Sequence, residues 1–166
     1  MVNDRKDLAK MRIVANETTA GEIAKLRQKL LVPLASESSL ETFCEDLIDY
    51  LKPRLRVDRI YVCDTKDGAI CAGWMKGRNM VRQSDWESGQ CPLELDDTLQ
   101  KALESDESIM NPVPGEGADL AVAIRFPDRA PWLMVFDETT VARTFSGTDL
   151  IYVYLARDLI LLKARL

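Results

Sequence analysis

Apolar residues recur at three- and four-residue spacing in three stretches of the chain, which predicts three amphipathic helices. The first runs from about residue 16 to residue 34, where Pro33 is expected to bend or end it. The second opens with a predicted capping box at Ser38 and Glu41, and its regular pattern stops at Pro53. The third spans residues 146–166 and is the longest.

The third predicted helix carries apolar residues on more than one face. One stripe consists of Ile151, Leu155, Leu159, Leu162 and Leu166. Other apolar residues lie off that stripe: Leu150, Val153, Tyr154, Ile160 and Leu161. A helix that is apolar on two faces needs burial on two sides. One face is therefore expected to cover a sheet, and another to pack against the N-terminal helix or a second subunit.

Short apolar runs between the second and third helices predict β-strands. They cover residues 57–64, 69–75, 80–84, 108–111, 120–126 and 132–137. The Asp67-Gly68 dipeptide predicts a hairpin turn between the first two runs, and Asp96 or Asp97 is expected to cap a short intervening helix. Because hairpins dominate, the pattern indicates an α+β fold with an antiparallel sheet covered by helices.

Charge and length narrow the class of protein. The 166 residues suffice for one domain, and the net charge of −5 opposes non-specific binding to nucleic acid or to an anionic membrane. The polar N-terminal residues do not resemble a signal peptide, and no apolar run reaches the length of a membrane span. The four cysteines form no C-x-x-C pair and the chain has no histidine, so no metal site is expected. These features predict a cytoplasmic protein with free thiols.

Two stretches in the second half resemble the GAF domain family. Residues 120–137 resemble the family's central hairpin, with an apolar strand, a tight turn and a second strand that ends in Phe136-Asp137. Residues 145–150 resemble the approach to the family's final helix, with an aromatic residue at Phe145 and an acid at Asp149. Residues 40–64 resemble its first helix and strand. The resemblance covers residues 30–166 and leaves residues 1–29 as a linker or helical arm.

The resemblance implies a GAF-like, PAS-related fold: a six-stranded antiparallel sheet with the N- and C-terminal helices packed on one face. It further implies a regulatory, non-catalytic domain that binds a small molecule or a partner and signals through its terminal helices to an output domain. Homodimerisation through those helices is expected, with these candidate interface residues: Ile23, Leu26, Leu30, Leu150, Tyr154 and Leu161. A degenerate domain that only dimerises is the alternative.

The ligand pocket of such a domain lies, by the same resemblance, on the other face of the sheet. Its candidate residues are Trp74, Arg78, Arg82, Trp86, Cys91 and Arg125. Aromatic and guanidinium groups in this combination can hold a planar or anionic metabolite. The competing interpretation is that Trp74 packs in the core and the arginines are solvated.

No known ligand of the family is indicated. Members that bind cyclic nucleotides carry an Asn-Lys pair and a Phe-x-x-x-Asp-Glu motif, whereas here Leu150 replaces the glutamate and Glu138-Thr139 replace the pair. Bilin attachment and a histidine-ligated haem both lack their histidines in this chain.

A thiol-dependent methionine-sulfoxide-type reductase is a further alternative, since Cys63, Cys71 and Cys91 could approach one another. However, a nucleophilic thiol needs nearby positive charge, and Asp64 follows Cys63. Cys91 is the candidate for an exposed, redox-sensitive thiol.

Overall fold

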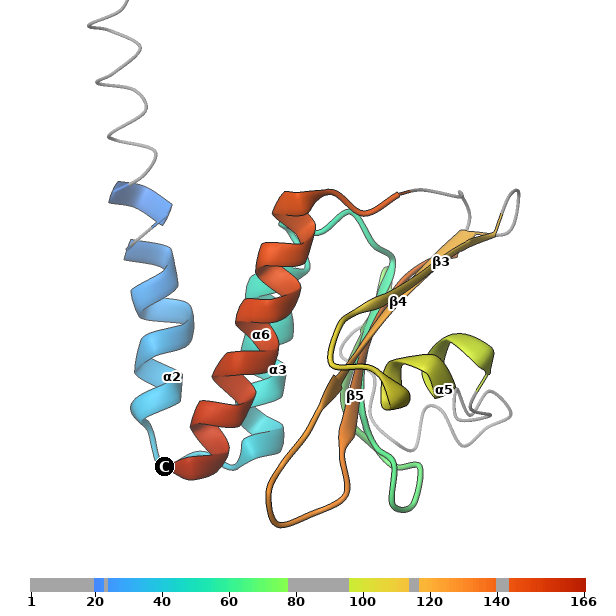
Figure 1. The fold of residues 1–166 in the computed structure, drawn as a ribbon. Helices are drawn as coiled ribbons and strands as arrows, with labels where there is room; N and C mark the ends of the chain where they lie inside the picture. Colours follow the sequence, from blue (N-terminus) through green and yellow to red (C-terminus); the bar gives the residue numbers. More distant parts are fainter. Residues whose placement is uncertain (1–19, 23, 78–95, 114–116, 140–143) are drawn as a thin grey trace, which may run out of the picture.

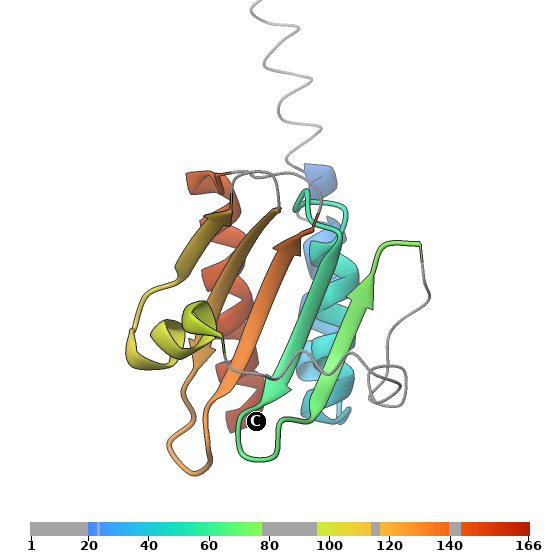
Figure 2. The same ribbon diagram turned by 90° about the vertical axis from the view of Figure 1, so that its right-hand side faces the viewer.

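The fold is built on a five-stranded antiparallel sheet. The computed structural model describes residues 20–22, 24–77, 96–113, 117–139 and 144–166. The strands are β1 (Arg59–Asp64), β2 (Ile70–Met75), β3 (Ile109–Val113), β4 (Gly117–Ile124) and β5 (Trp132–Glu138). They lie side by side in the order β2-β1-β5-β4-β3 (Figure 2). The predicted α+β class and antiparallel pairing are thus confirmed.

Five of the six predicted strands correspond to β1–β5 within a few residues at their ends. The sixth, at residues 80–84, lies outside the described residues. The hairpin predicted at Asp67-Gly68 joins β1 to β2, and Gly68 adopts a φ of 74°, which a residue without a side chain adopts most easily.

Side chains alternate between the two faces of the sheet, as the twofold period of a strand requires. On one face, residues such as Ile60, Val62 and Met134 join the main hydrophobic core beneath the helices. On the other face, Tyr61 and Leu133 belong to a second, smaller cluster with α5 (Asp97–Glu104). The molecule is therefore layered, with α3 (Leu40–Leu51) and α6 (Gly147–Arg165) on one side and α5 on the other (Figure 1).

The N-terminal helix forms a further layer outside α3 and α6 (Figure 1). It contains a π-helical segment, η1 (Arg27–Leu31), followed directly by α2 (Val32–Ala35). Pro33 does not end the helix as expected, because the helix continues for two more residues, to Ala35. Pro33 is the second residue of α2, directly after the π-helical segment, and it has no N–H to donate to the preceding turn.

Two basic side chains, one buried and one partly buried, fasten the N-terminal helix to the domain. Lys163 of α6 is 8% exposed and donates hydrogen bonds to the carbonyls of Pro33, Leu34 and Ser36. Arg54 donates to Glu22 at 3.0 Å, and its guanidinium lies 3.7 Å from the centre of the Tyr50 ring. Contacts from residue 22 onward show that the helix packs on the domain on both sides of the predicted boundary at residue 30.

The start of α3 differs from its prediction by one residue. Ser39, and not Ser38, is the N-cap, and its side chain accepts a hydrogen bond from the backbone N–H of Thr42. The Ser38 hydroxyl instead lies 2.7 Å from that of Ser36. Alternative serines next to each other cannot be ranked by spacing alone, because the backbone turn decides which one adopts the extended conformation.

The long helix α6 begins with a reciprocal capping box. The Ser146 side chain accepts from the Asp149 N–H, and the Asp149 carboxylate accepts from the Ser146 N–H. Phe145, just before it, is buried at 4% exposure. The predicted features of this turn are confirmed: an aromatic anchor followed by an acid in the first turn.

The face of α6 that covers the sheet is the one that lies off the Ile151 stripe, a choice that the sequence pattern leaves open. The fully buried apolar residues are Val153, Ala156 and Ile160. Ile151 is 67% exposed and Leu162 is 45% exposed, although both belong to the more regular stripe. The small Ala156 allows close approach to the sheet, whereas periodicity alone cannot say which of two apolar faces makes that approach.

The candidate interface residues lie mostly against the chain's own core. Leu30 is fully buried within the chain and is not available to a partner in this packing. Leu26, Leu150, Tyr154 and Leu161 are partly buried against the main core. Ile23 lies outside the described residues. Among the helices that the structure describes, none has the length and apolar character needed to cross a membrane.

Candidate functional site

A row of charged side chains crosses three adjacent strands on the face opposite α3 and α6. In the strand register, Arg59 of β1 lies opposite Asp137 of β5, and Asp137 lies opposite Asp119 of β4. The Arg59 guanidinium donates from Nε at 2.6 Å and from Nη2 at 2.5 Å to Oδ2 of Asp137. Segments distant in sequence thus place one cation and two carboxyl groups side by side.

Asp137 is almost completely buried, with 2% exposure. Burial raises its pKa to about 7 against the lowering influence of Arg59, and the neighbouring Asp119 raises it further. Burial also raises the pKa of Asp119. Two carboxyl groups this close to one guanidinium favour holding a proton on Asp137, so the row can change charge near neutral pH.

The surroundings of the row are aromatic and apolar on one side and open on the other. Tyr61 lies next to Arg59 along β1, and burial raises the pKa of its phenol above the usual range. A hollow of about 370 Å³ adjoins Arg59 at the end of the sheet. Its lining residues are Asp58, Arg59, Met75, Lys76 and Thr139. The arrangement can exchange protons and bind polar groups of a small molecule.

The structure disperses the two predicted pocket residues that it describes. Trp74 is partly buried and packs against the core on the helix side of the sheet. Arg125 donates to the carbonyls of Leu103 at 2.5 Å and Ser105 at 2.9 Å, where it ties down the C-terminal end of α5. Arg78, Arg82, Trp86 and Cys91 lie outside the described residues.

The described cysteines sit in environments that suppress thiolate formation. Cys44 and Cys63 are fully buried, and Cys71 is partly buried. Burial raises the pKa of Cys71 to about 12, and it raises that of Cys44 well above the usual range. The raised pKa values keep Cys44 and Cys71 protonated at neutral pH and make them poor nucleophiles.

Sequence reasoning missed the charged row, although signals for two of its members were present. In the sequence pattern Asp137 only ends a predicted strand, and Arg59 is one position of the predicted strand at residues 57–64. An ionisable residue inside an apolar strand signals either a buried pair or a site. Asp119 precedes the apolar run of residues 120–124, where it reads as a loop residue.

Comparisons with known proteins identify similarity of structure but not of sequence. No protein-family model matches the chain, and no curated protein sequence matches it. Among solved structures, the GAF domain of a protein described as a sensor histidine kinase from Pseudomonas syringae pv. tomato has a TM-score of 0.58 at 13% identity, with 91% of this chain and 92% of that chain covered.

Two further structures align over a similar length. The GAF domain of a phosphoenolpyruvate-protein phosphotransferase from Acinetobacter has a TM-score of 0.58 at 10% identity, covering 87% of this chain and 93% of that chain. Free methionine-R-sulfoxide reductase from Neisseria meningitidis, solved with its substrate, has a TM-score of 0.57 at 12% identity, covering 87% and 90%. At these identities the likeness concerns the fold.

Proposed function

We propose that this chain, whose fold is that of a GAF domain, is a non-catalytic sensory domain that binds a small polar molecule at the charged row. The observation that carries the proposal is the buried Asp137, paired with Arg59 and flanked by Asp119. An ion pair that only stabilises the fold needs one carboxyl group beside Arg59. The second carboxylate, that of Asp119, repels the first and destabilises the row unless a proton or a ligand neutralises one of them.

The position of Asp137 suggests how binding would be transmitted. It is the last residue but one of β5, and the same chain segment continues to α6, which begins at Gly147. A ligand that donates hydrogen bonds to the carboxyl groups would favour one protonation state and one packing of the β5 end. The terminal helices would then report the shift in population to an output domain.

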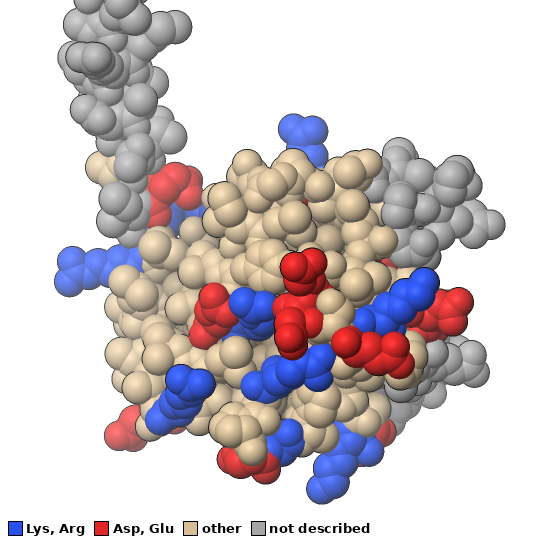
Figure 3. All heavy atoms as spheres, viewed as in Figure 1, with Lys and Arg blue, Asp and Glu red and all other residues tan. Residues whose placement is uncertain are grey.

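The ligand class follows from the chemistry of the row. Carboxylates accept hydrogen bonds only, so a ligand with amino or other N–H donors fits them, and an acceptor on the ligand can face Arg59. Lysines, arginines and acids are interspersed on the face seen in Figure 3, and this mixture offers no track for a phosphate backbone. As part of the same proposal, the domain acts in the cytoplasm, and the net charge of −5 disfavours direct nucleic-acid binding.

Native mass spectrometry on gently purified protein tests this function. We expect the wild-type protein to retain an added mass, or to gain thermal stability from members of a panel of small amines. Asp119→Asn keeps the size of the side chain but removes its charge, and it should abolish either effect. Thr148→Ala, at an exposed position in the first turn of α6, is the matched control. The proposal would be refuted if the wild-type protein retained no added mass and if no member of the panel raised its thermal stability.

Homodimerisation through the terminal helices is a second part of the proposal. The exposed Ile151, Leu162 and Leu166 on α6, together with Leu31 and Val32 on the N-terminal helix, leave apolar surface uncovered. Sedimentation of wild type against Ile151→Lys would measure this: we expect a dimer that becomes a monomer. A wild-type monomer at micromolar concentration would exclude the dimer.

The thiol-reductase alternative has one observation in its favour, the structural likeness to the Neisseria reductase. The raised pKa of Cys71 and the burial of Cys63 disfavour it. The assay measures reduction of free methionine sulfoxide with dithiothreitol. If the wild type has this activity and Cys91→Ser or Cys71→Ser loses it, the chain is a reductase and the sensory proposal is wrong. We expect no turnover.

A further inference from the structure

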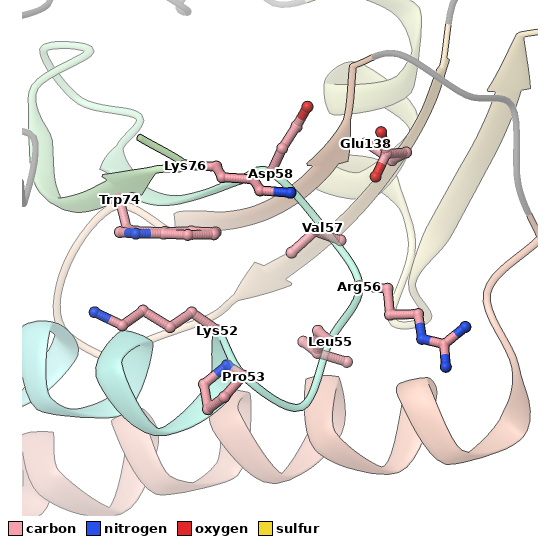
Figure 4. A pocket seen from close by; sticks show the side chains of 9 residues that line it. All are labelled: Lys52, Pro53, Leu55, Arg56, Val57, Asp58, Trp74, Lys76 and Glu138. Carbon is pink, nitrogen blue, oxygen red and sulfur yellow. The ribbon is translucent and has the colours of Figure 1, made fainter. Parts of the chain in front are cut away.

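A second hollow, of about 530 Å³, lies between the end of α3 and the edge strand β2 (Figure 4). Its lining residues are Lys52, Pro53, Leu55, Arg56, Val57, Asp58, Trp74, Lys76 and Glu138. Trp74 lies on the helix side of the sheet, whereas the charged row occupies the opposite side. The two hollows meet only at Asp58 and Lys76, at the end of the sheet.

The walls of this hollow are shaped for a flat ring. In Figure 4 the indole of Trp74 is seen edge-on, with the Lys52 side chain drawn between it and Pro53 at the end of α3, and with Leu55 to one side on the connection that follows. Leu55 is 2% exposed and Val57 is 6% exposed, so both are fixed by packing and form a rigid apolar floor. A planar group placed between the indole and this floor gains both stacking and apolar burial.

The charges around the indole favour an anion. Lys76 and Lys52 extend on opposite sides of the indole plane in Figure 4. Lys76 is exposed and makes no ion pair with any described residue, whereas Lys52 Nζ is paired with Asp49 at 2.5 Å. Arg56 adds a third cation at the rim.

The two acidic side chains of the lining do not pair with Lys76. The Asp58 carboxylate accepts from the backbone N–H of Thr139 at 3.1 Å and points away from the ring slot (Figure 4). Glu138 lies at the far end, at the end of β5. Because Lys52 is already paired with Asp49, Lys76 is the cation that can serve an anion beside the partly exposed indole.

We propose that this hollow is a binding site for a planar aromatic monoanion, such as an aromatic carboxylate. The ring stacks on Trp74 above Leu55, and the carboxylate binds the ammonium group of Lys76, with Lys52 as a second cation. This site adjoins the hollow at the charged row, with which it shares Asp58 and Lys76, and it does not depend on the proposed function. It lies against α3, so occupation would act directly on the helix layer.

The experiment is a titration of ¹⁵N-labelled protein with 2-naphthoate, followed by NMR at the indole N–H signals. The chain has three tryptophans, and Trp74→Phe assigns the signal of Trp74. We expect that signal to shift saturably with 2-naphthoate. The neutral analogue 2-naphthalenemethanol and the cation 2-naphthylmethylamine, which have the same ring, should bind at least about threefold more weakly, as expected for the loss of exposed charge pairs.

Variants separate this site from the rest of the molecule. Lys76→Gln and Lys52→Gln should each weaken 2-naphthoate binding roughly two- to fivefold. Lys66→Gln, at an exposed hairpin position, should leave it unchanged. Trp74→Leu should abolish binding while circular dichroism reports a folded protein, and Asp137→Asn should have no effect, because it tests the other site.

Three results would overturn the proposal. The first is equal binding of 2-naphthoate and its neutral analogue, which indicates an apolar surface only. The second is an unchanged Trp74 signal at millimolar 2-naphthoate. The third is binding that is indifferent to both Lys76→Gln and Lys52→Gln.

Discussion

Replacing Lys163 with methionine should loosen the N-terminal helix from the domain. The Lys163 ammonium donates to Ser36 O at 2.6 Å and to Pro33 O and Leu34 O at 3.3 Å, at the end of that helix. These carbonyls lie at the end of the helix, where the Pro33 carbonyl also accepts from the Ser36 N–H at 3.2 Å and from the Ser36 hydroxyl at 2.7 Å. Methionine keeps the length and apolar stem of the side chain, so the packing beside Phe43 is largely preserved while the three donors are lost.

The expected loss can be worked out from these contacts. Hydrogen bonds to a charged group contribute roughly 1.5–3 kcal/mol each, but the buried ammonium also costs several kcal/mol of lost hydration. Water can reach Ser36, which lines a hollow of about 620 Å³ with Lys163. The net destabilisation should therefore be about 2 kcal/mol, which lowers Tm by about 4–8 °C for a domain of this size.

Urea unfolding followed by circular dichroism measures this free energy. Hydrogen exchange should show faster exchange in residues 27–36, while the sheet remains protected. Lys66→Met, at an exposed hairpin position, is the control and should unfold like the wild type. A Lys163→Met protein within about 0.5 kcal/mol of wild type, with unchanged exchange in residues 27–36, would refute the reasoning.

Three other predictions test the site and the fold. Folded Asp137 has a pKa of about 7, above its unfolded value of about 4, so the wild type should lose stability as the pH rises from 4 to 7 by at most about 4 kcal/mol. Asp137→Asn should flatten this dependence in urea unfolding at pH 5 and pH 8, and parallel curves would contradict the assigned pKa. Gly117→Ala should lower Tm, because φ is 118° and an added Cβ would collide with the Glu138 carbonyl; Gly147→Ala, where nothing lies within 4 Å, should be tolerated. Ser146→Ala should cost about 1 kcal/mol by urea unfolding, since it removes the cap of α6, and an effect no larger than that of Thr148→Ala would argue against the capping box.

The sequence determined the elements where the physical signal is local. Apolar periodicity identified α3, α6 and five strands. The cap predicted at Asp96 or Asp97 is Asp96, whose side chain accepts from the Leu99 N–H. The same locality explains the misplacements: neighbouring Ser38 and Ser39 are equivalent by spacing, and a π-helical turn beside Pro33 leaves no pattern in the sequence.

Only the tertiary structure decided which faces meet. Val153 and Ile160 of α6 cover the sheet while Ile151 faces outward, although both faces are apolar in the sequence. Arg59 and Asp137 are 78 residues apart and become partners only through strand register. Periodicity records which side chains share a face, but the pairing of faces depends on shape and close packing across the whole chain. The charged row and the slot beside Trp74 are therefore products of the fold.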